Sequence, residues 1–96
     1  MQVRILSPAN LDIVEAVNYY ERQQAGLGSE FAAEVARSIQ HISDFPSSYA
    51  LVSARLRRCK LARFPFGVLY HVKEQTIVIV AVVHLFRDPS VWQGRV

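Results

Sequence analysis

The unbroken apolar run from Ile77 to Val83 constrains the fold of this chain more than any other feature. It contains only Val, Ile and Ala, so neither face of a strand built from it would meet water. Runs of this kind are typical of strands that are covered on both faces. We therefore expect residues 76–84 to form a central strand of a sheet.

A second apolar run, at residues 66–72, precedes the first, and the polar residues 73–75 separate the two. Both runs are rich in the β-branched and aromatic residues that favour strands. Their short polar connection predicts an antiparallel β-hairpin. Beyond the second strand the sequence becomes ionisable, with His84, Arg87 and Asp88. Recognition or chemistry is expected where this strand leaves the core.

Two helices are expected ahead of the hairpin. After a short strand at residues 2–6, Ser7 and Pro8 suit the N-cap and the first position of a helix. Apolar residues then recur at helical spacing to about residue 24. A break at residues 26–28 is followed by a second amphipathic helix, which begins near Ser29 and ends before Pro46. So short a connection predicts an antiparallel helical hairpin.

The remaining segments complete a single α+β domain over residues 1–96, in the order β-α-α-β-β-β. Residues 54–63 predict a strand, although their composition also permits a helix, and residues 85–96 predict a tail or one short turn. The result is a mostly antiparallel sheet with the helical hairpin on one face. Since the tail can cover only part of the other face, we expect a partner chain to cover the rest.

Composition narrows the class of protein. Hydrophobic residues make up 51% of the 96 positions, which argues against disorder. The net charge of +3 suits nucleic acid or an acidic protein but requires neither. The single cysteine, Cys59, excludes an internal disulfide and fits a reducing compartment. The sequence has no apolar stretch of membrane-helix length and no signal-peptide core. We expect a cytoplasmic protein with no membrane partner and no cofactor.

Three stretches, together with the order of elements, resemble a known family. They are LRRCKLARFPFGVLYHV at residues 56–72, TIVIVAVVHLFRDP at residues 76–89, and the following Trp92. Taken together they resemble the RelE/ParE superfamily, the toxins of bacterial type II toxin–antitoxin (plasmid stabilisation) modules. The resemblance covers nearly the whole chain. The strand exit at residues 84–89 looks closer to the ParE-like branch.

The resemblance implies a toxin that is neutralised by a small cognate antitoxin, whose C-terminal segment wraps around it. ParE-like members inhibit DNA gyrase and are not nucleases. RelE-like members are endoribonucleases that cut mRNA on the ribosome. We expect the ParE-like activity, with gyrase as the target. The RelE-like endoribonuclease, with ribosome and mRNA as partners, is the alternative, and a member that only binds its antitoxin is a third possibility.

Strand alternation predicts which side chains share a face of the sheet. On the predicted strand at residues 54–63 and the strand that follows it, the residues expected to face the helices are Cys59, Leu61, Phe66, Val68, Tyr70 and Val72. The residues expected on the outer face are Arg58, Lys60, Gly67, Leu69, His71 and Lys73. The outer face should therefore carry a basic patch, joined by Arg87 at the strand exit. A solvated strand face would look the same, because Lys and Arg commonly decorate one.

The resemblance also suggests roles for individual residues. For a nuclease, the candidate catalytic residues are Arg58, Lys60, His71, His84 and Arg87. For binding of the target or the antitoxin, the candidates are Arg58, Lys60, Arg63, Leu69, Arg87 and Trp92. We expect His84 to be a strand-end histidine hydrogen-bonded to the backbone rather than a catalytic group. The histidines and Cys59 lack metal-ligand spacing, so no metal site is expected.

Two positions depart from the nuclease pattern. Gly67 stands where the nuclease branch has an arginine that holds the scissile phosphate, and glycine has no side chain to do so. Trp92 stands near that branch's Tyr or His, and an indole cannot exchange a proton near neutral pH. RNA cleavage needs both charge stabilisation and proton transfer. The sequence therefore predicts toxicity without mRNA cleavage.

Overall fold

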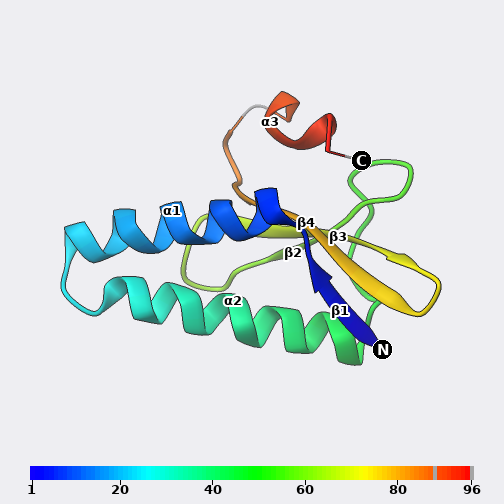
Figure 1. Cartoon of the computed structure of the whole chain (residues 1–96), viewed down its shortest axis with the longest axis horizontal. Coiled ribbons are helices and arrows are strands. Elements are labelled where there is room, and N and C mark those ends of the chain that lie inside the picture. Colours follow the sequence, from blue (N-terminus) through cyan, green and yellow to red (C-terminus); the bar gives the residue numbers. More distant parts are fainter. Residues whose placement is uncertain (88, 96) are drawn as a thin grey trace.

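In residues 1–87 and 89–95, which the computed structural model describes, four strands form one mixed sheet and two long helices cover one of its faces (Figure 1). The spatial order of the strands is β1-β4-β3-β2. This confirms the α+β fold and the predicted order of elements. The elements are β1 (Gln2–Ile5), α1 (Ser7–Gln23), α2 (Leu27–Asp44), β2 (Arg57–Lys60), β3 (Phe66–Lys73), β4 (Thr76–His84) and the short α3 (Ser90–Gln93).

The starts of both long helices differ from the prediction. Ser7 is the first residue of α1 rather than its cap, and the N-cap is Leu6, which makes no side-chain cap bond. Pro8 lies in the first turn, where its missing N–H costs nothing. Helix α2 begins at Leu27, two residues early, because Gly26 adopts a left-handed φ of 88° and lets the chain turn straight into it.

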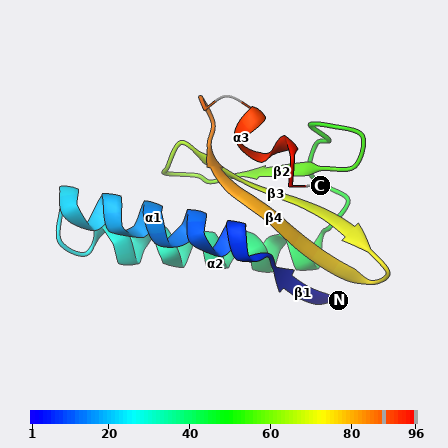
Figure 2. The same cartoon turned by 45° about the horizontal axis from the view of Figure 1, so that its top comes forward.

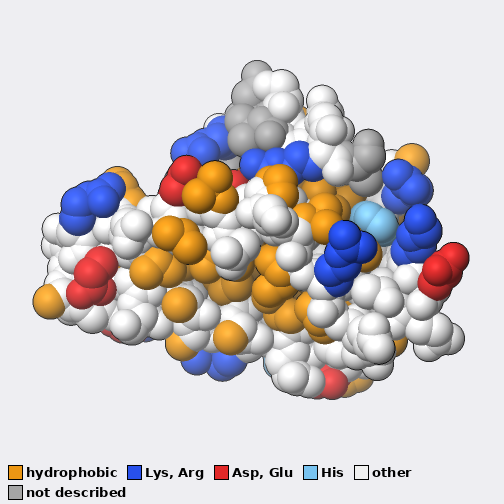
Figure 3. All heavy atoms as spheres, in the orientation of Figure 1, with side chains coloured by type: hydrophobic (Ala, Val, Ile, Leu, Met, Phe, Trp, Pro, Cys, Tyr) orange, Lys and Arg blue, Asp and Glu red, His pale blue; other side chains and the backbone are white. Residues whose placement is uncertain are grey.

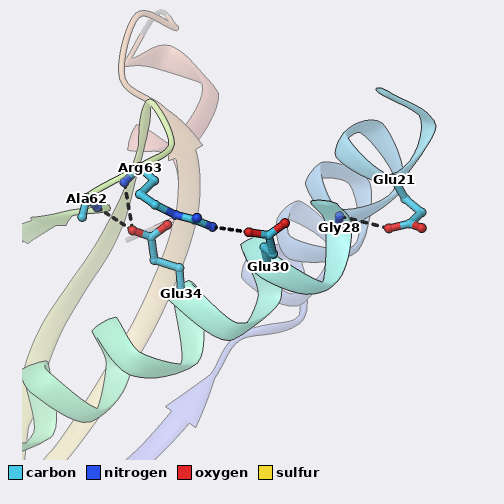
Figure 4. Close-up of polar contacts among 6 residues, drawn as sticks. All are labelled: Glu21, Gly28, Glu30, Glu34, Ala62 and Arg63. Atoms are coloured by element: carbon cyan, nitrogen blue, oxygen red, sulfur yellow. Dashed lines mark hydrogen bonds and ion pairs between the residues drawn. The ribbon is translucent and has the colours of Figure 1, made fainter. Parts of the chain in front are cut away.

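Glu21 of α1 caps the next helix from outside it. Its two carboxylate oxygens accept the N–H groups of Gly26, at 2.9 Å, and Gly28, at 3.0 Å. Figure 4 shows the contact with Gly28. A carboxylate at a helix N-terminus satisfies free N–H groups and complements the helix dipole. The contact therefore fixes the turn of the helical hairpin.

The sheet is less antiparallel and has a shorter edge than predicted. Strand β1 pairs with β4 in parallel, whereas β3 is antiparallel to both of its neighbours. Strand β2 spans four residues, not the predicted 54–63. The preceding residues fold back on themselves, with a bridge between Leu51 and Arg57 and a 2.8 Å bond from Val52 N–H to the Leu56 carbonyl. Their alternating sequence resembles a strand but forms a loop.

A β-bulge interrupts the alternation of side chains along β4. Leu69 of β3 lies opposite Ala81, but the next residue, Tyr70, lies opposite Ile79, so β4 has one extra residue, Val80. Val80 and Ala81 therefore both face away from the helices, whereas Ile79 and Val82 both pack on the helix side. A bulge of this kind shifts the register without ending the strand.

Each face of the sheet has its own core. The helix-side core joins α1 and α2 to the sheet and contains Ala9, Ala16, Phe31, Val35, Ile42, Cys59, Leu61, Phe64, Val68, Tyr70, Ile77, Ile79 and Val82. The outer core contains Leu56, Leu69, Val78, Val80, Ala81 and Val83, with Leu6, Val52 and Trp92 packed against it. Val72, predicted to face the helices, is exposed at the hairpin end.

The chain itself closes the outer face over β4. Every residue from Ile77 to Val83 is buried, and Trp92 and the loop before β2 complete the cover. In Figure 2, α3 lies on the opposite side of the sheet from the two long helices. The prediction that the central strand needs a partner chain to cover it was therefore wrong, because the loop at residues 51–56 contributes as well as the tail.

Candidate functional site

The outer face carries the predicted site residues, but it does not hold them in one patch. Arg58, His84, Arg87 and Trp92 line a small cavity of about 60 Å³ where β4 ends. We call these four residues and Gly67 the strand-exit site. His71 lies elsewhere, in a groove at the other end of β3. The structure therefore divides the predicted basic patch into two sites.

The side chain of Arg58 lies over Gly67. In register, Gly67 pairs with Lys60 and the neighbouring Leu69 pairs with Arg58. A Cβ at Gly67 would lie 2.9 Å from Cγ and 3.0 Å from Cδ of Arg58, and 3.2 Å from a methyl of Leu85. The stem of Arg58 therefore fills the space where a larger residue at position 67 would place its side chain.

His84 is engaged by its surroundings. Its Nδ1 accepts the N–H of Phe86 at 3.2 Å, and its ring packs edge-on against Phe66 with 5.3 Å between ring centroids. The prediction of a strand-end histidine bonded to the backbone is confirmed. Since Nδ1 is an acceptor here, the neutral ring has Nε2 alone to offer as a donor.

The other predicted binding residues are scattered. Lys60 is exposed on β2, and Arg87 is exposed at the strand exit. Leu69 is 1% exposed within the outer core, so its side chain does not reach the surface in this structure. Arg63 lies in the β2–β3 turn and is ion-paired with Glu30 of α2 at 2.9 Å. Arg63 is thus bound to the helical hairpin.

A buried carboxylate holds the turn that carries Arg63. The Oε1 atom of Glu34 in α2 accepts the N–H groups of Ala62 at 2.8 Å and Arg63 at 2.9 Å (Figure 4). Sequence reasoning missed this residue, because a single Glu on a helix carries no signal for a contact 28 positions away. Its effect is to fix the β2–β3 turn against α2.

The groove at the hairpin end is strongly basic. It has a volume of about 440 Å³ and is lined by Pro46, Ser47, Leu51, Ala54, Arg55, Arg57, His71, Val72 and Lys73. We call it the hairpin-end groove. Burial lowers the pKa of His71 below its usual value, and the positive charges of Arg55 and Lys73 lower it further. The imidazole therefore favours its neutral form.

A third depression lies between α1 and the end of β4. This α1–β4 groove has a volume of about 510 Å³ and is lined by Asp12, Glu15, Ala16, Tyr19, Tyr20, Pro65, Phe66, Val82, His84 and Arg87. Tyr19 of α1 is half exposed in its lining. Pairing between β1 and β4 ends at Ile5 and Ile79, so no described strand lies along this edge of β4 beyond Ile79.

An ion pair attaches the C-terminal tail to that edge. The guanidinium of Arg95 contacts both carboxylate oxygens of Asp12, at 2.6 and 3.2 Å, and donates to the Val80 carbonyl at 3.3 Å. Asp12 also accepts the N–H of Val82 at 3.0 Å. The tail clasp, Asp12 with Arg95, thus satisfies backbone groups beside the bulge. Sequence reasoning missed it, since neither residue has a local pattern that indicates the other.

The buried thiol and phenol do not supply reactive groups. Burial raises the pKa of the Cys59 thiol and raises the pKa of Tyr70 to about 12. The Tyr70 hydroxyl donates to the Pro46 carbonyl at 2.6 Å. Within the described residues, no three His, Cys, Asp or Glu side chains are grouped to hold a metal ion. In the same part of the chain, no helix is long and apolar enough to span a membrane.

Comparison with known proteins identifies the family. The family model of the ParE toxin of the type II toxin–antitoxin system, parDE, matches residues 3–89. A solved structure of the chromosomal ParDE TA system from P. aeruginosa superimposes with a TM-score of 0.79. The two chains are 16% identical, and the match covers 88% of this chain and 95% of that one. At this identity the likeness shows the fold alone.

A comparison with the curated proteins gave no match. The family model nevertheless spans nearly the whole sequence, from the first strand to the start of the C-terminal tail. The chain therefore belongs to the ParE toxin family of type II toxin–antitoxin systems.

Proposed function

We propose that this toxin acts in the cytoplasm by inhibiting DNA gyrase, and that a cognate antitoxin neutralises it by binding. The observation that carries the proposal is the closed strand-exit site. Its cavity of about 60 Å³ is well below the roughly 300–1,000 Å³ of ordinary ligand pockets. An mRNA nucleotide would have to displace side chains of the chain itself to enter it.

The chemistry of the strand-exit site supports the same proposal. RNA cleavage needs a cation at the phosphate and groups that move protons. The stem of Arg58 fills the space over Gly67, and Trp92 packs against the outer core with an indole that does not titrate near neutrality. His84 has one ring nitrogen occupied by a backbone N–H. A toxin that acts by binding needs none of these groups to be free.

The α1–β4 groove is the surface we assign to the antitoxin. No described strand pairs with this edge of β4 beyond Ile79. An antitoxin segment would add a strand there by displacing the tail clasp, which bonds the backbone of Val80 and Val82, and main-chain pairing with pockets for alternate side chains is a common mode of peptide binding. The exposed Tyr19 of α1, which lines the groove, supplies apolar contact area beside this edge. An antitoxin segment bound here would cover apolar groups that are otherwise in water.

The test combines purified gyrase with the toxin and with the protein encoded by the adjacent gene as the antitoxin. We expect cleaved plasmid to accumulate with the toxin and to disappear when the antitoxin is added. The variant Tyr19→Glu should still trap cleaved plasmid but resist the antitoxin, because it places a charge on an exposed residue that lines the α1–β4 groove. The matched control, Ala33→Glu on α2, should behave as the parent. Absence of trapped plasmid from gyrase treated with folded toxin would refute the proposed target.

A further inference from the structure

We propose that the hairpin-end groove is a second binding site, separate from the strand-exit site and the α1–β4 groove, and that it takes an acidic, partly apolar segment of a protein partner. The inference goes beyond the proposed function, since neither gyrase inhibition nor neutralisation at the α1–β4 groove requires it. Three features carry it: the charge of the groove, its apolar lining and its position.

The charge of the groove is not neutralised by the chain. Arg55, Arg57 and Lys73 line it, and no acidic residue does. Among the described residues, ion pairs involve Arg63 and Arg95 and none of these three cations. Figure 3 shows Lys and Arg side chains gathered around a histidine over this end of the molecule, with one acidic side chain beyond them. Opposite charge on a partner is the expected complement.

His71 lies inside the groove and is affected by the same positive charges. It is partly buried on β3, and the groups facing it are the cations Arg55 and Lys73. Both disfavour the imidazolium form, because like charges nearby disfavour a further positive charge. Glu74, the nearest acidic residue in sequence, lies in the β3–β4 turn and does not line the groove. A carboxylate bound in the groove would reverse this effect.

The apolar lining distinguishes a peptide from nucleic acid. Leu51 and Val72 lie beside the cations with 54% and 42% of their surface exposed, and Pro46 adds a further apolar wall. A nucleic-acid backbone presents phosphates and sugars, which place no apolar side chain against such residues. A peptide that alternates carboxylates with aliphatic side chains satisfies both parts of the lining. Its carboxylates would meet Arg55 and Lys73, and its aliphatic groups would meet Leu51 and Val72.

The position of the groove allows simultaneous binding at the other sites. Residues 46–57 and the hairpin end of β3 form it, whereas the strand-exit site lies at the opposite end of β3 and β4. The α1–β4 groove shares no lining residue with the hairpin-end groove. A partner in the hairpin-end groove therefore leaves both other surfaces free.

The experiment measures binding of a fluorescein-labelled peptide, Asp-Leu-Glu-Asp-Val-Glu-Asp-Leu, to the purified chain by fluorescence anisotropy at low salt. The control peptide replaces Asp by Asn and Glu by Gln. The groove variant is Arg55→Glu with Lys73→Glu. The matched control is Arg22→Glu with Arg37→Glu, two exposed arginines of the helices, which gives a chain of the same net charge.

We expect the groove variant to raise the Kd of the acidic peptide at least about tenfold and the matched control to change it less than about twofold, since nearby rather than overall charge governs a specific site. The amide peptide should bind weakly to every chain. The milder Arg55→Ala with Lys73→Ala should act in the same direction if the Glu variant unfolds. In NMR titrations of the parent, the pKa of His71 should rise when the acidic peptide is added.

Three outcomes would overturn the inference. They are equal weakening by the two charge variants, a pKa of His71 that the peptide leaves unchanged, and a short DNA duplex that binds more tightly than the peptide and is lost in the groove variant. The last would assign the groove to nucleic acid instead. The measurement uses neither gyrase nor antitoxin, so its failure would leave the proposed function untouched.

Discussion

The two faces of the sheet are buried in different ways. On the helix side, α1 and α2 lie along the sheet, and four aromatic rings pack with centroids 4.8 to 6.1 Å apart: Tyr20, Phe31, Phe64 and Phe66. On the outer side, a loop, one tryptophan and the tail clasp provide the cover. The helix side therefore rests on many mutually supporting contacts, and the outer side rests on a few, each from a different segment.

The largest effect should come from the helix-side core. Phe31→Ala removes a fully buried ring that contacts three other aromatic rings. We expect the free energy of unfolding to fall by about 3–5 kcal/mol, because the cavity adds to the lost transfer energy. Urea denaturation measures it, with Phe86→Ala, at an 85% exposed site, as the control. Equal losses of stability in the two variants would show that the helix-side core contributes no more than an exposed aromatic residue.

The outer face should respond to the tail clasp with a smaller loss. Arg95→Ala leaves Asp12 without its partner in a site where both side chains are less than one fifth exposed (19% and 16%). We expect a loss of about 1.5–3 kcal/mol, the range of charged hydrogen bonds. The emission of Trp92, the single tryptophan, should shift to the red as the tail loosens. A double-mutant cycle with Asp12→Ala should show coupling. Strictly additive losses would show that the contact between Asp12 and Arg95 does not stabilise the protein.

The turn of the helical hairpin provides a third, smaller test on the helix side. A Cβ at Gly28 would lie 2.5 Å from the Val17 carbonyl oxygen, a backbone atom that cannot rotate away. Gly28→Ala should cost about 1–2 kcal/mol, within the range of overpacking. Gly94→Ala in the tail, where a Cβ meets nothing within 4 Å, should change stability by less than about 0.5 kcal/mol. Equal melting temperatures of the two variants would show that α1 and α2 can move apart at Gly28 without loss of stability.

The smallest effect concerns pH and the outer face. The folded chain lowers the pKa of His71 below 6.5, through burial and then Arg55 and Lys73. Below pH 6.5 the unfolded chain binds more protons at this site, so stability should decrease as the pH falls toward the folded pKa and should be fully present above 6.5. His71→Gln should flatten this part of the stability profile, measured by urea midpoints. An unchanged profile would mean that His71 is not perturbed by folding.

Sequence periodicity predicted the parts of the fold that repeat a local pattern. The helical stripes gave α1 and α2 to within about two residues, since boundaries depend on capping contacts rather than on periodicity. The uninterrupted run at Ile77–Val83 correctly indicated a strand buried on both faces. Alternation correctly placed Arg58 and Lys60 on the face opposite Cys59. In each case the neighbours in sequence determine the environment.

The parts that sequence could not predict depend on distant contacts. The parallel pairing of β1 with β4 and the bulge at Val80 leave no composition signal. Asp12 and Arg95 are 83 positions apart. Residues 54–56 were predicted to begin a strand because residues 54–63 nearly alternate, but they belong to a loop whose fold is set by hydrogen bonds within it. The basic residues divide between two sites, because Arg58 and Arg87 line the cavity at the strand exit, whereas Arg55, Arg57 and Lys73 line the groove at the hairpin end.

The central claim is that the chain itself fills the strand-exit site, so that toxicity requires no cut in RNA. The most direct measurement adds the purified toxin to ribosomes translating a defined mRNA and maps new 5′ ends by primer extension. We predict the same ends with the toxin as without it. New cuts in phase with codons, which vanish with Arg58→Ala or Arg87→Ala, would contradict the claim and make this chain a ribonuclease.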